Sequence, residues 1–243
     1  MRPMKRVLLI LMIVWGGGGK LFYEGMNLSP ENKTSLSWGN RFEQQLICGV
    51  LGGWRPVVAD LAWLRVTTSW ESRQWSRLHE NIRMAVRMQP ESLLFWDIGA
   101  WHLAWNASLG ERNNRLESQM EKRHERELYW IEQGRSLLEE GVRYHPNHFK
   151  IWLQLGLLHQ ERRHDFGAAY DCFLRASHLE GAPGYVARLA GYALEKQGDR
   201  ARALEYWNDL LERSSNPADR TLIEKRLLKL EKDSMISPLK PLP

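Results

Sequence analysis

The chain has 243 residues, of which 43% are hydrophobic and 26% charged, as in proteins that fold around a core. Its 34 basic and 29 acidic residues are interspersed, so the formal charge of +5 forms no basic block of the kind that nucleic-acid-binding proteins carry. The two cysteines, Cys48 and Cys172, lie far apart without a metal-ligand spacing, and we interpret both as isolated thiols.

The segment 1–23 has the layout of an export signal. Basic residues precede an apolar run from Val7 to Trp15, and four glycines follow it. A helix between Arg6 and Lys20 would be about 20 Å long, shorter than the ~30 Å core of a bilayer, so a cleaved signal peptide and a retained membrane anchor are both open. The basic flank predicts that everything after Lys20 lies on the periplasmic side of the cytoplasmic membrane, tethered to it or exported.

Residues 24–48 lack a repeat pattern, and we interpret them as a linker or an amino-terminal extension. Residues 49–232 are predicted to form pairs of helices. The first pair, at about 59–90, is diverged, and its second helix matches that of the next pair at a constant offset in the numbering, 138 minus 82, or 56. The matching positions are Ile82, Ala85, Val86 and Pro90 with Leu138, Gly141, Val142 and Pro146.

The second pair, at 93–146, contains an insertion at 107–129. Its first helix matches the first helix of the following pair at the same offset of 56 residues. The period of the later pairs is 34 residues, so this offset contains 22 additional residues. The matching positions are Phe95, Trp96, Gly99, Ala100 and Leu103 with Ile151, Trp152, Leu155, Gly156 and His159. We interpret the insertion as more helix, and a functional arm is the alternative. Four residues predict an apolar stripe on it: Leu116, Met120, His124 and Leu128.

The third and fourth pairs, at 149–182 and 184–216, repeat with a period of 186 minus 152, or 34. Apolar residues spaced by three, four and seven predict helices, and small residues among them let two helices approach closely. Eight positions recur in register: Trp152, Leu155, Gly156, His159, Ala169, Phe173, Ala176 and Pro183 correspond to Val186, Leu189, Ala190, Ala193, Ala203, Trp207, Leu210 and Pro217. A fixed period of this length is typical of stacked helical hairpins.

The carboxyl-terminal residues are predicted to close the array. Residues 218–232 are interpreted as a capping helix, because their leucines are surrounded by charged residues. Residues 233–243 contain three prolines and are interpreted as a disordered tail. Docking of their Pro-x-x-Pro spacing on an aromatic groove is the alternative.

The third pair resembles the tetratricopeptide family, whose pattern places Trp-x2-Leu-Gly-x2-Tyr, Ala-x3-Phe and a proline in about 34 residues. The matching residues are Trp152, Leu155, Gly156, Ala169, Phe173 and Ala176. In two departures, each first helix is one residue longer than the consensus spacing, and His159 replaces an aromatic residue. The resemblance implies an all-α fold, a tetratricopeptide-like α-solenoid, preceded here by the signal or anchor segment.

Residues 49–108 are also similar to a group of bacterial membrane-associated repeat proteins without an established activity. This resemblance is carried by Gly52, Gly53, Trp54, Ala59, Asp60, Trp63, Leu64 and Arg65, and then by Gln89, Pro90, Trp101, Ala104, Trp105 and Asn106. It supports the fold prediction more than any function.

The sequence contains none of the usual motifs for a nucleophilic serine, a zinc-binding helix or a phosphate-binding loop. His145 and His148 flank Pro146, but no Cys, Asp or Glu lies close enough in sequence to complete a metal site. We therefore predict a protein that is not an enzyme and requires no metal, cofactor or small-molecule substrate.

In the tetratricopeptide family the first helix of each pair lines a concave face, so the resemblance implies a partner-binding groove. The expected groove residues are Leu94, Asp97, Trp101, Trp105, Lys150, Leu153, Leu157 and Glu161. The sequence leaves open whether Trp101 and Trp105 contact a partner or pack in the core.

The function expected from repeats and an export signal is a membrane-tethered or exported scaffold or assembly factor that binds other proteins. A permanent structural subunit of an envelope complex is the alternative, and an exported enzyme is a third hypothesis. The sequence does not identify the partner, the oligomeric state or the fate of the signal segment.

Overall fold

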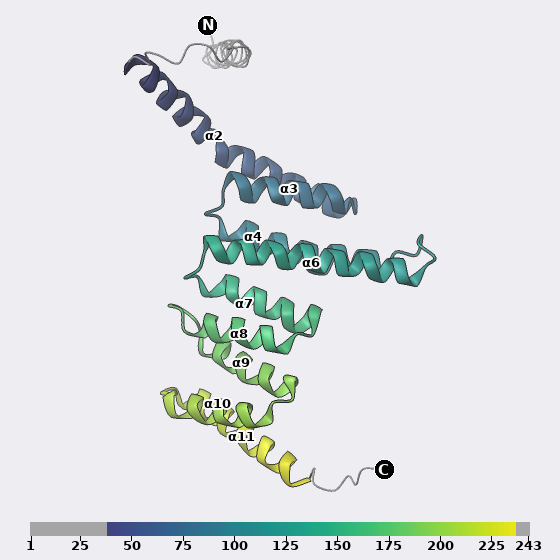
Figure 1. Cartoon of the computed structure of the whole chain (residues 1–243), viewed down its shortest axis with the longest axis vertical. Coiled ribbons are helices and arrows are strands. Elements are labelled where there is room, and N and C mark those ends of the chain that lie inside the picture. The colour runs from purple at the N-terminus through teal and green to yellow at the C-terminus, as the bar shows by residue number, and fades with distance from the viewer. Residues whose placement is uncertain (1–37, 237–243) are drawn as a thin grey trace, which may run out of the picture. The chain divides into compact units, whose positions relative to one another are not determined.

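The structure is a computed structural model that describes the backbone of residues 38–236 and the side-chain environment of residues 53–232. The regular elements in this range are all helices (Figure 1), which confirms the all-α prediction. No helix in the same range is long and apolar enough to cross a membrane. The predicted signal segment at 1–23 and residues 237–243 of the predicted tail lie outside the described residues.

The chain divides into two compact units, residues 1–52 and 53–243. In the second unit, successive helices pack on one another as hairpins (Figure 1): α2 with α3, the continuous helix α4–η1–α5 with α6, α7–η2 with α8, and α9 with α10, followed by α11. The bounds are α2 Trp38–Glu71, α3 Trp75–Met88, α4 Leu93–Trp101, η1 His102–Ala107, α5 Ser108–Arg112, α6 Met120–Tyr144, α7 Phe149–Leu158, η2 His159–Arg163, α8 Phe166–Ser177, α9 Gly184–Gln197, α10 Arg200–Arg213 and α11 Pro217–Ile236.

The turns of the third and fourth hairpins repeat the same chemistry at equivalent positions of the repeat. His164 and Gly198 both adopt a left-handed conformation, with φ of 54° and 86°. Each is followed by an aspartate whose side chain accepts a hydrogen bond from a backbone N–H at the start of the next helix, at 3.0 Å for Asp165 and 3.2 Å for Asp199. Such caps satisfy N–H groups that lack a partner within the helix.

Close contact between the helices of these hairpins depends on small residues. A Cβ atom at Gly156 would lie 2.6 Å from the ring of Phe173, and one at Gly191 would lie 2.5 Å from the ring of Trp207. Phe173 and Trp207 occupy equivalent positions of the repeat, so the same aromatic contact recurs. The expected close approach is present in both hairpins, but in the fourth it is made at Gly191, one residue after Ala190, the position that the period of 34 pairs with Gly156.

Two groups of buried residues form the core of the second unit. The first joins α2 and α3 to the second hairpin and α7, and includes Leu78, Ile82, Trp96 and Leu103. The second joins the third and fourth hairpins to α11. Each hairpin therefore buries its apolar residues against the hairpins before and after it, as expected for a solenoid.

Two first helices contain a π-helical turn. These turns are η1 in the second hairpin and η2 in the third. A π turn bonds residues five apart and takes up one residue more than an α turn. It accommodates the additional residue in these two hairpins, whereas α9 remains α-helical over its full length.

The insertion at 107–129 lengthens both helices of the second hairpin, and a turn interrupts them between α5 and α6. Leu116 lies in this turn and is 97% exposed, and Met120 and Leu128 are also exposed. The predicted apolar stripe is therefore incomplete, because Leu116 lies outside α6, the helix that holds Met120, His124 and Leu128. The insertion lengthens the helices of the hairpin.

α2 begins at Trp38, inside the segment 24–48 that the sequence suggested as a linker. It continues through Gly49, Gly52, Gly53 and Pro56. Glycine in a helix costs only about 1 kcal/mol relative to alanine. The three-and-four spacing of apolar residues persists across these glycines, which agrees with a helix that begins before the predicted first pair at about 59–90.

Candidate functional site

The eight predicted groove residues lie on α4, η1, α7 and η2, whose outer surface is here called the first-helix face. The structure separates these residues into two groups. Leu94 and Trp101 are 54% and 43% exposed. Lys150 and Glu161 are exposed as well, and Asp97 is half-buried. These five side chains are accessible to a partner.

The other three predicted residues belong to the core. Leu153 is only 7% exposed and lies in the core group shared by the third and fourth hairpins. Leu157 packs against that group, and Trp105 packs against the group formed by the first two hairpins. The two tryptophans that the sequence could not distinguish therefore differ: Trp101 is on the surface and Trp105 is partly covered.

Asp97 and Lys150 provide the polar groups of the first-helix face. Partial burial raises the pKa of the Asp97 carboxyl above its usual range, and the positive charge of Lys150 acts in the opposite direction. The two residues belong to the first helices of consecutive hairpins. Asp97 is thus a carboxylate in a poorly hydrated setting, where it gains from a hydrogen-bond donor or a cation.

A residue of α2 extends this surface. Trp70 is 40% exposed, and its ring lies 5.6 Å, edge to face, from the ring of His102. The ring of Trp101 lies 5.3 Å from His102 on the same helix. Asn106 hydrogen-bonds the His102 Nδ1 at 2.9 Å, and burial lowers the His102 pKa. Sequence reasoning missed Trp70 because the first hairpin is too diverged to align residue by residue.

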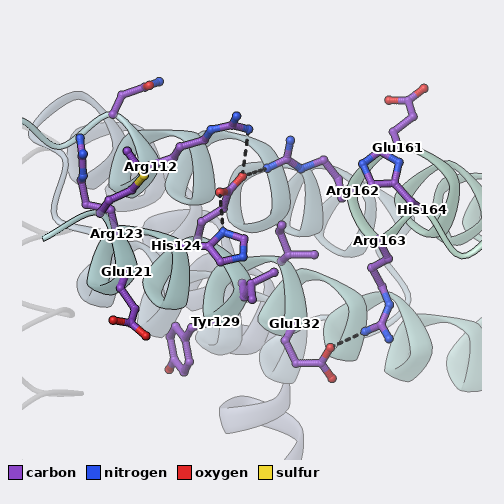
Figure 2. A pocket seen from close by; sticks show the side chains of 15 residues that line it. Arg112, Glu121, Arg123, His124, Tyr129, Glu132, Glu161, Arg162, Arg163 and His164 are labelled. Atoms are coloured by element: carbon purple, nitrogen blue, oxygen red, sulfur yellow. Dashed lines mark hydrogen bonds and ion pairs between the residues drawn. The ribbon is translucent and has the colours of Figure 1, made fainter.

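The insertion borders an open cavity of about 1370 Å³. It lies between α5 and the amino-terminal half of α6 on one side and the end of η2 on the other (Figure 2). Because the second hairpin is longer than the third, it projects past η2 and leaves this space (Figure 1). The period of the repeat gave no indication of the cavity.

The wall of the cavity is an ion-pair network centred on the buried carboxylate of Glu127 (Figure 2). Arg162 from η2 lies 3.1 Å from this carboxylate, and Arg112 and His124 each lie 3.5 Å from it. Arg162 also donates to the Ala104 carbonyl and to the Ser108 hydroxyl, both at 3.0 Å. Its guanidinium therefore joins the third hairpin to the π-helical turn of the second.

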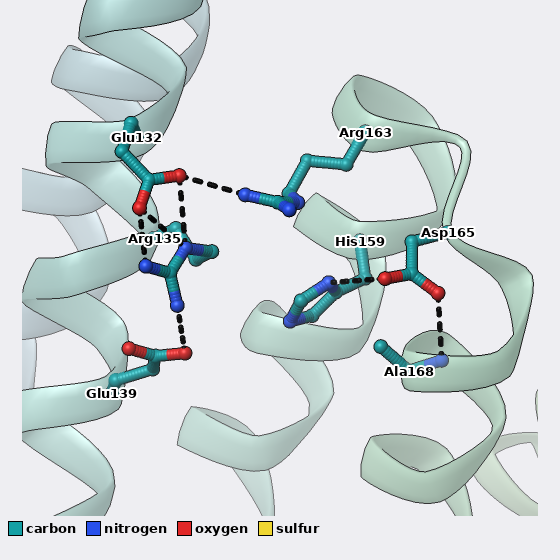
Figure 3. Close-up of polar contacts among 7 residues, drawn as sticks. All are labelled: Glu132, Arg135, Glu139, His159, Arg163, Asp165 and Ala168. Carbon is teal, nitrogen blue, oxygen red and sulfur yellow. Dashed lines mark hydrogen bonds and ion pairs between the residues drawn. The ribbon is translucent and has the colours of Figure 1, made fainter.

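A second polar cluster lies on the same side of these hairpins (Figure 3). Arg135 bonds Glu132 and Glu139 on its own helix, and Arg163 of η2 bonds Glu132 at 2.7 Å. Nearby, the ring of the buried His159 lies 4.0 Å from Asp165. Burial lowers the pKa of His159. The charged groups pair with one another, so this cluster connects hairpins.

The described residues contain no group of three or more His, Cys, Asp or Glu side chains that could hold a metal ion. Cys172 is buried, and burial raises the pKa of its thiol to about 12, which keeps it protonated. The buried carboxylate of Glu127 pairs with Arg162 and Arg112.

No protein-family model matches the sequence, and no curated protein matches it. Among solved structures, a thermophilic tetratricopeptide protein of Thermus thermophilus is similar at 19% identity and a TM-score of 0.42, over 70% of this chain and 79% of that one. The MamA protein is similar at 10% identity and a TM-score of 0.32, over 76% of this chain and 98% of that one. Independently of both, the recurring hairpins, turns and aromatic contacts show a tetratricopeptide-like repeat fold.

Proposed function

We propose that the protein is a protein-binding module that holds a segment of a partner on the first-helix face. The observation that supports this proposal is the exposure of Leu94 and Trp101 on one helix, beside the half-buried Asp97. Large apolar side chains that remain exposed in a folded helical array are typical anchors for a partner, and tryptophan is among the residues that contribute most to such interfaces.

The chemistry of the surface indicates the kind of segment that fits. Trp101 and Leu94 match apolar side chains of an amphipathic helix or an extended peptide. The Asp97 carboxylate matches a basic side chain or a backbone N–H between them, because such a donor offsets the cost of its partial burial. Lys150 places a positive charge at the edge of the same surface. The proposed partner segment is therefore apolar with at least one donor or basic group.

The proposal includes the location suggested by the amino-terminal segment, which places the array outside the cytoplasm and tethers it to the membrane. The support is the basic and apolar pattern of residues 1–23. Fusion of alkaline phosphatase after Pro243 tests the side of the membrane, and extraction of membranes at alkaline pH tests the tether. An inactive fusion would contradict the location outside the cytoplasm. Release of the full chain by alkaline extraction would contradict the membrane tether.

The binding site is tested with two double variants of the full-length chain. Leu94→Ala with Trp101→Ala removes the exposed anchors, whereas Tyr129→Ala with Leu228→Ala removes two exposed apolar side chains elsewhere, on α6 and α11. Partners are captured from membranes solubilised in mild detergent, and binding of each recovered protein is then measured with purified components. Both variants should keep the helical circular dichroism of the parent, because all four residues are exposed.

We expect the variant Leu94→Ala with Trp101→Ala to bind the partner at least tenfold more weakly, since each anchor contributes more than about 1 kcal/mol in typical interfaces. The control variant should bind like the parent. Equal binding by both variants would refute the proposed site. Recovery of a stoichiometric complex that does not dissociate on dilution would favour the alternative, a permanent structural subunit.

A further inference from the structure

α2 has a row of large apolar side chains that nothing covers in the described part of the chain. Trp54, Leu61 and Leu64 are 50%, 54% and 66% exposed, and Val57 and Val58 are also exposed. We call this row the α2 outer face. A helix of a water-soluble array normally exposes polar residues on its outer side, so an apolar row of this length marks an interaction surface.

The opposite side of α2 is already occupied by the core. Ala59, Ala62 and Val66 are buried there together with residues of α3, and the ring of Trp63 lies 4.9 Å from that of Phe95 in α4. α2 is thus held in the array by one side while its outer face points away. A partner can reach the outer face without unfolding the first hairpin.

The spacing of the outer face is that of a coiled coil. Trp54, Val57, Leu61 and Leu64 follow one another at intervals of three, four and three residues, the a and d positions of successive heptads. A seam with this period fits another helix with the same period rather than an irregular surface.

Two charged residues flank the seam and are self-complementary. With Leu61 as an a position, Asp60 occupies g and Arg65 occupies e. In a parallel, in-register pair, the g residue of one helix lies beside the e residue of the following heptad in the other. Asp60 of one chain would then lie beside Arg65 of the second chain, and the reverse pair would form as well. An antiparallel pair places g against g and e against e, which loses both ion pairs.

We propose that the α2 outer face binds a second copy of this chain, as a parallel two-stranded coiled coil with Trp54, Val57, Leu61 and Leu64 in its seam. The resulting dimer has two-fold symmetry, with the same surface on both sides of the interface. It leaves the first-helix face of each copy available. A parallel arrangement also directs both amino-terminal segments the same way, which agrees with the membrane tether proposed above but does not depend on it.

Cysteine cross-linking of the full-length chain tests the arrangement directly. In a Cys48→Ser background, Leu61→Cys places a thiol at an a position. In a parallel, in-register pair the two introduced thiols, one from each chain, lie next to each other. Mild copper-catalysed oxidation should convert most of this variant into a covalent dimer. Leu222→Cys, an exposed leucine of α11, is the matched control and should remain mostly monomeric. Failure of Leu61→Cys to cross-link, with cross-linking only in a mixture of Val57→Cys and Leu61→Cys chains, would overturn the parallel arrangement, because an antiparallel pair packs a positions against d positions.

Charge exchange tests the same pair without a cross-link. Asp60→Arg or Arg65→Asp alone should raise the dissociation constant of the dimer roughly tenfold, because each places like charges together twice in the dimer. The double variant Asp60→Arg with Arg65→Asp should restore association, since both pairs are re-formed with opposite sign. Association is measured by analytical ultracentrifugation in mild detergent, with circular dichroism as a check on folding.

The full chain could also associate through the segment 1–23, and Leu61→Asp separates the two cases. Loss of the dimer in Leu61→Asp supports the proposal, because that residue is exposed and its replacement leaves the core intact. A parent chain that is monomeric at tens of micromolar would overturn the proposal, as would a dimer that persists in Leu61→Asp. Neither result depends on whether a partner occupies the first-helix face.

Discussion

The two ends of the helical array have opposite outer surfaces. At the carboxyl-terminal end, α11 buries Ile223, Leu227 and Leu230 against the fourth hairpin. Most of its outer residues are charged, including Glu224, Lys225, Lys229, Glu231 and Lys232, which are exposed. At the other end, α2 exposes an apolar seam. Stacked repeats need a polar cap where stacking stops. The carboxyl-terminal end supplies this cap itself, whereas the apolar seam of α2 is the surface proposed above to bind a second chain.

The comparison predicts that the same substitution has different effects at the two ends. Ile223→Asp introduces a charge into a site that is 1% exposed, and we expect it to lower the free energy of unfolding by about 4 kcal/mol. Leu61→Asp should change that of the monomer by less than about 0.5 kcal/mol, because Leu61 is exposed. Urea unfolding at low protein concentration measures both. Similar losses in the two variants would mean that the α2 outer face is part of the core.

The hairpins between the ends are joined by Arg162, and its removal should have the next largest effect. Arg162→Ala leaves the buried Glu127 carboxylate without its best partner, which typically costs about 3 kcal/mol. Arg163→Ala is the matched control, because its pair with Glu132 is much more exposed and should contribute less than about 1 kcal/mol. Urea unfolding again gives both values. If the two variants are equally stable, the Glu127 network does not hold the hairpins together.

Acid should loosen the amino-terminal hairpins before the carboxyl-terminal ones. Burial lowers the pKa of His79, His102 and His159 in the folded chain, so the unfolded chain binds more protons below pH ~6.5. The contribution of the three neutral histidines to the free energy of unfolding is complete above that pH. It is lost as the pH falls, by at most about 1.4 kcal/mol per pH unit for each histidine. α9, α10 and α11 contain no histidine.

Hydrogen exchange at pH 7.5 and pH 5, corrected for the intrinsic exchange rate, measures this difference. Protection should decrease most from α3 to η2 and least from α9 to α11. A uniform decrease, or a larger one in α9 to α11, would show that the buried histidines do not control the response to acid.

The smallest expected effect concerns a leucine at the capped end. Leu228 is 57% exposed on α11, and Leu228→Gln should change stability by less than about 0.5 kcal/mol without affecting self-association. Leu64→Gln removes a similarly exposed leucine from the seam of α2, and it should weaken the dimer several-fold. Analytical ultracentrifugation measures self-association of the two variants. Equal dissociation constants for Leu64→Gln and Leu228→Gln would show that the two ends of the array do not differ in this respect.

The repeat period predicted the local architecture well because it reflects contacts within one hairpin. The starts of the third and fourth hairpins at Phe149 and Gly184, and the contact of Gly156 with Phe173, follow from positions no further apart than one repeat. The sequence could not predict that Trp101 is exposed and Trp105 is partly covered, because the two residues lie four apart on one helix. What covers each ring is decided by neighbouring helices.

The period could not predict features that join distant parts of the chain. Arg162 meets Ala104 across 58 residues and Glu127 across 35, and no spacing rule relates them. The cavity beside them exists only because one hairpin is longer than the next. Likewise, the contact of Trp70 with His102 depends on how the first hairpin stacks on the second, and the length of α2 was hidden by its glycines.

Site-specific photo-cross-linking is the most direct test of whether the first-helix face holds a partner protein. A photoreactive phenylalanine analogue replaces Trp101 in one full-length variant and the exposed Tyr129 of α6 in a matched variant. Both are illuminated in cells of the natural host, and the products are resolved by mass. The account predicts a discrete cross-linked protein from position 101 and none from position 129. Products from position 129 alone, or the same products from both positions, would contradict it.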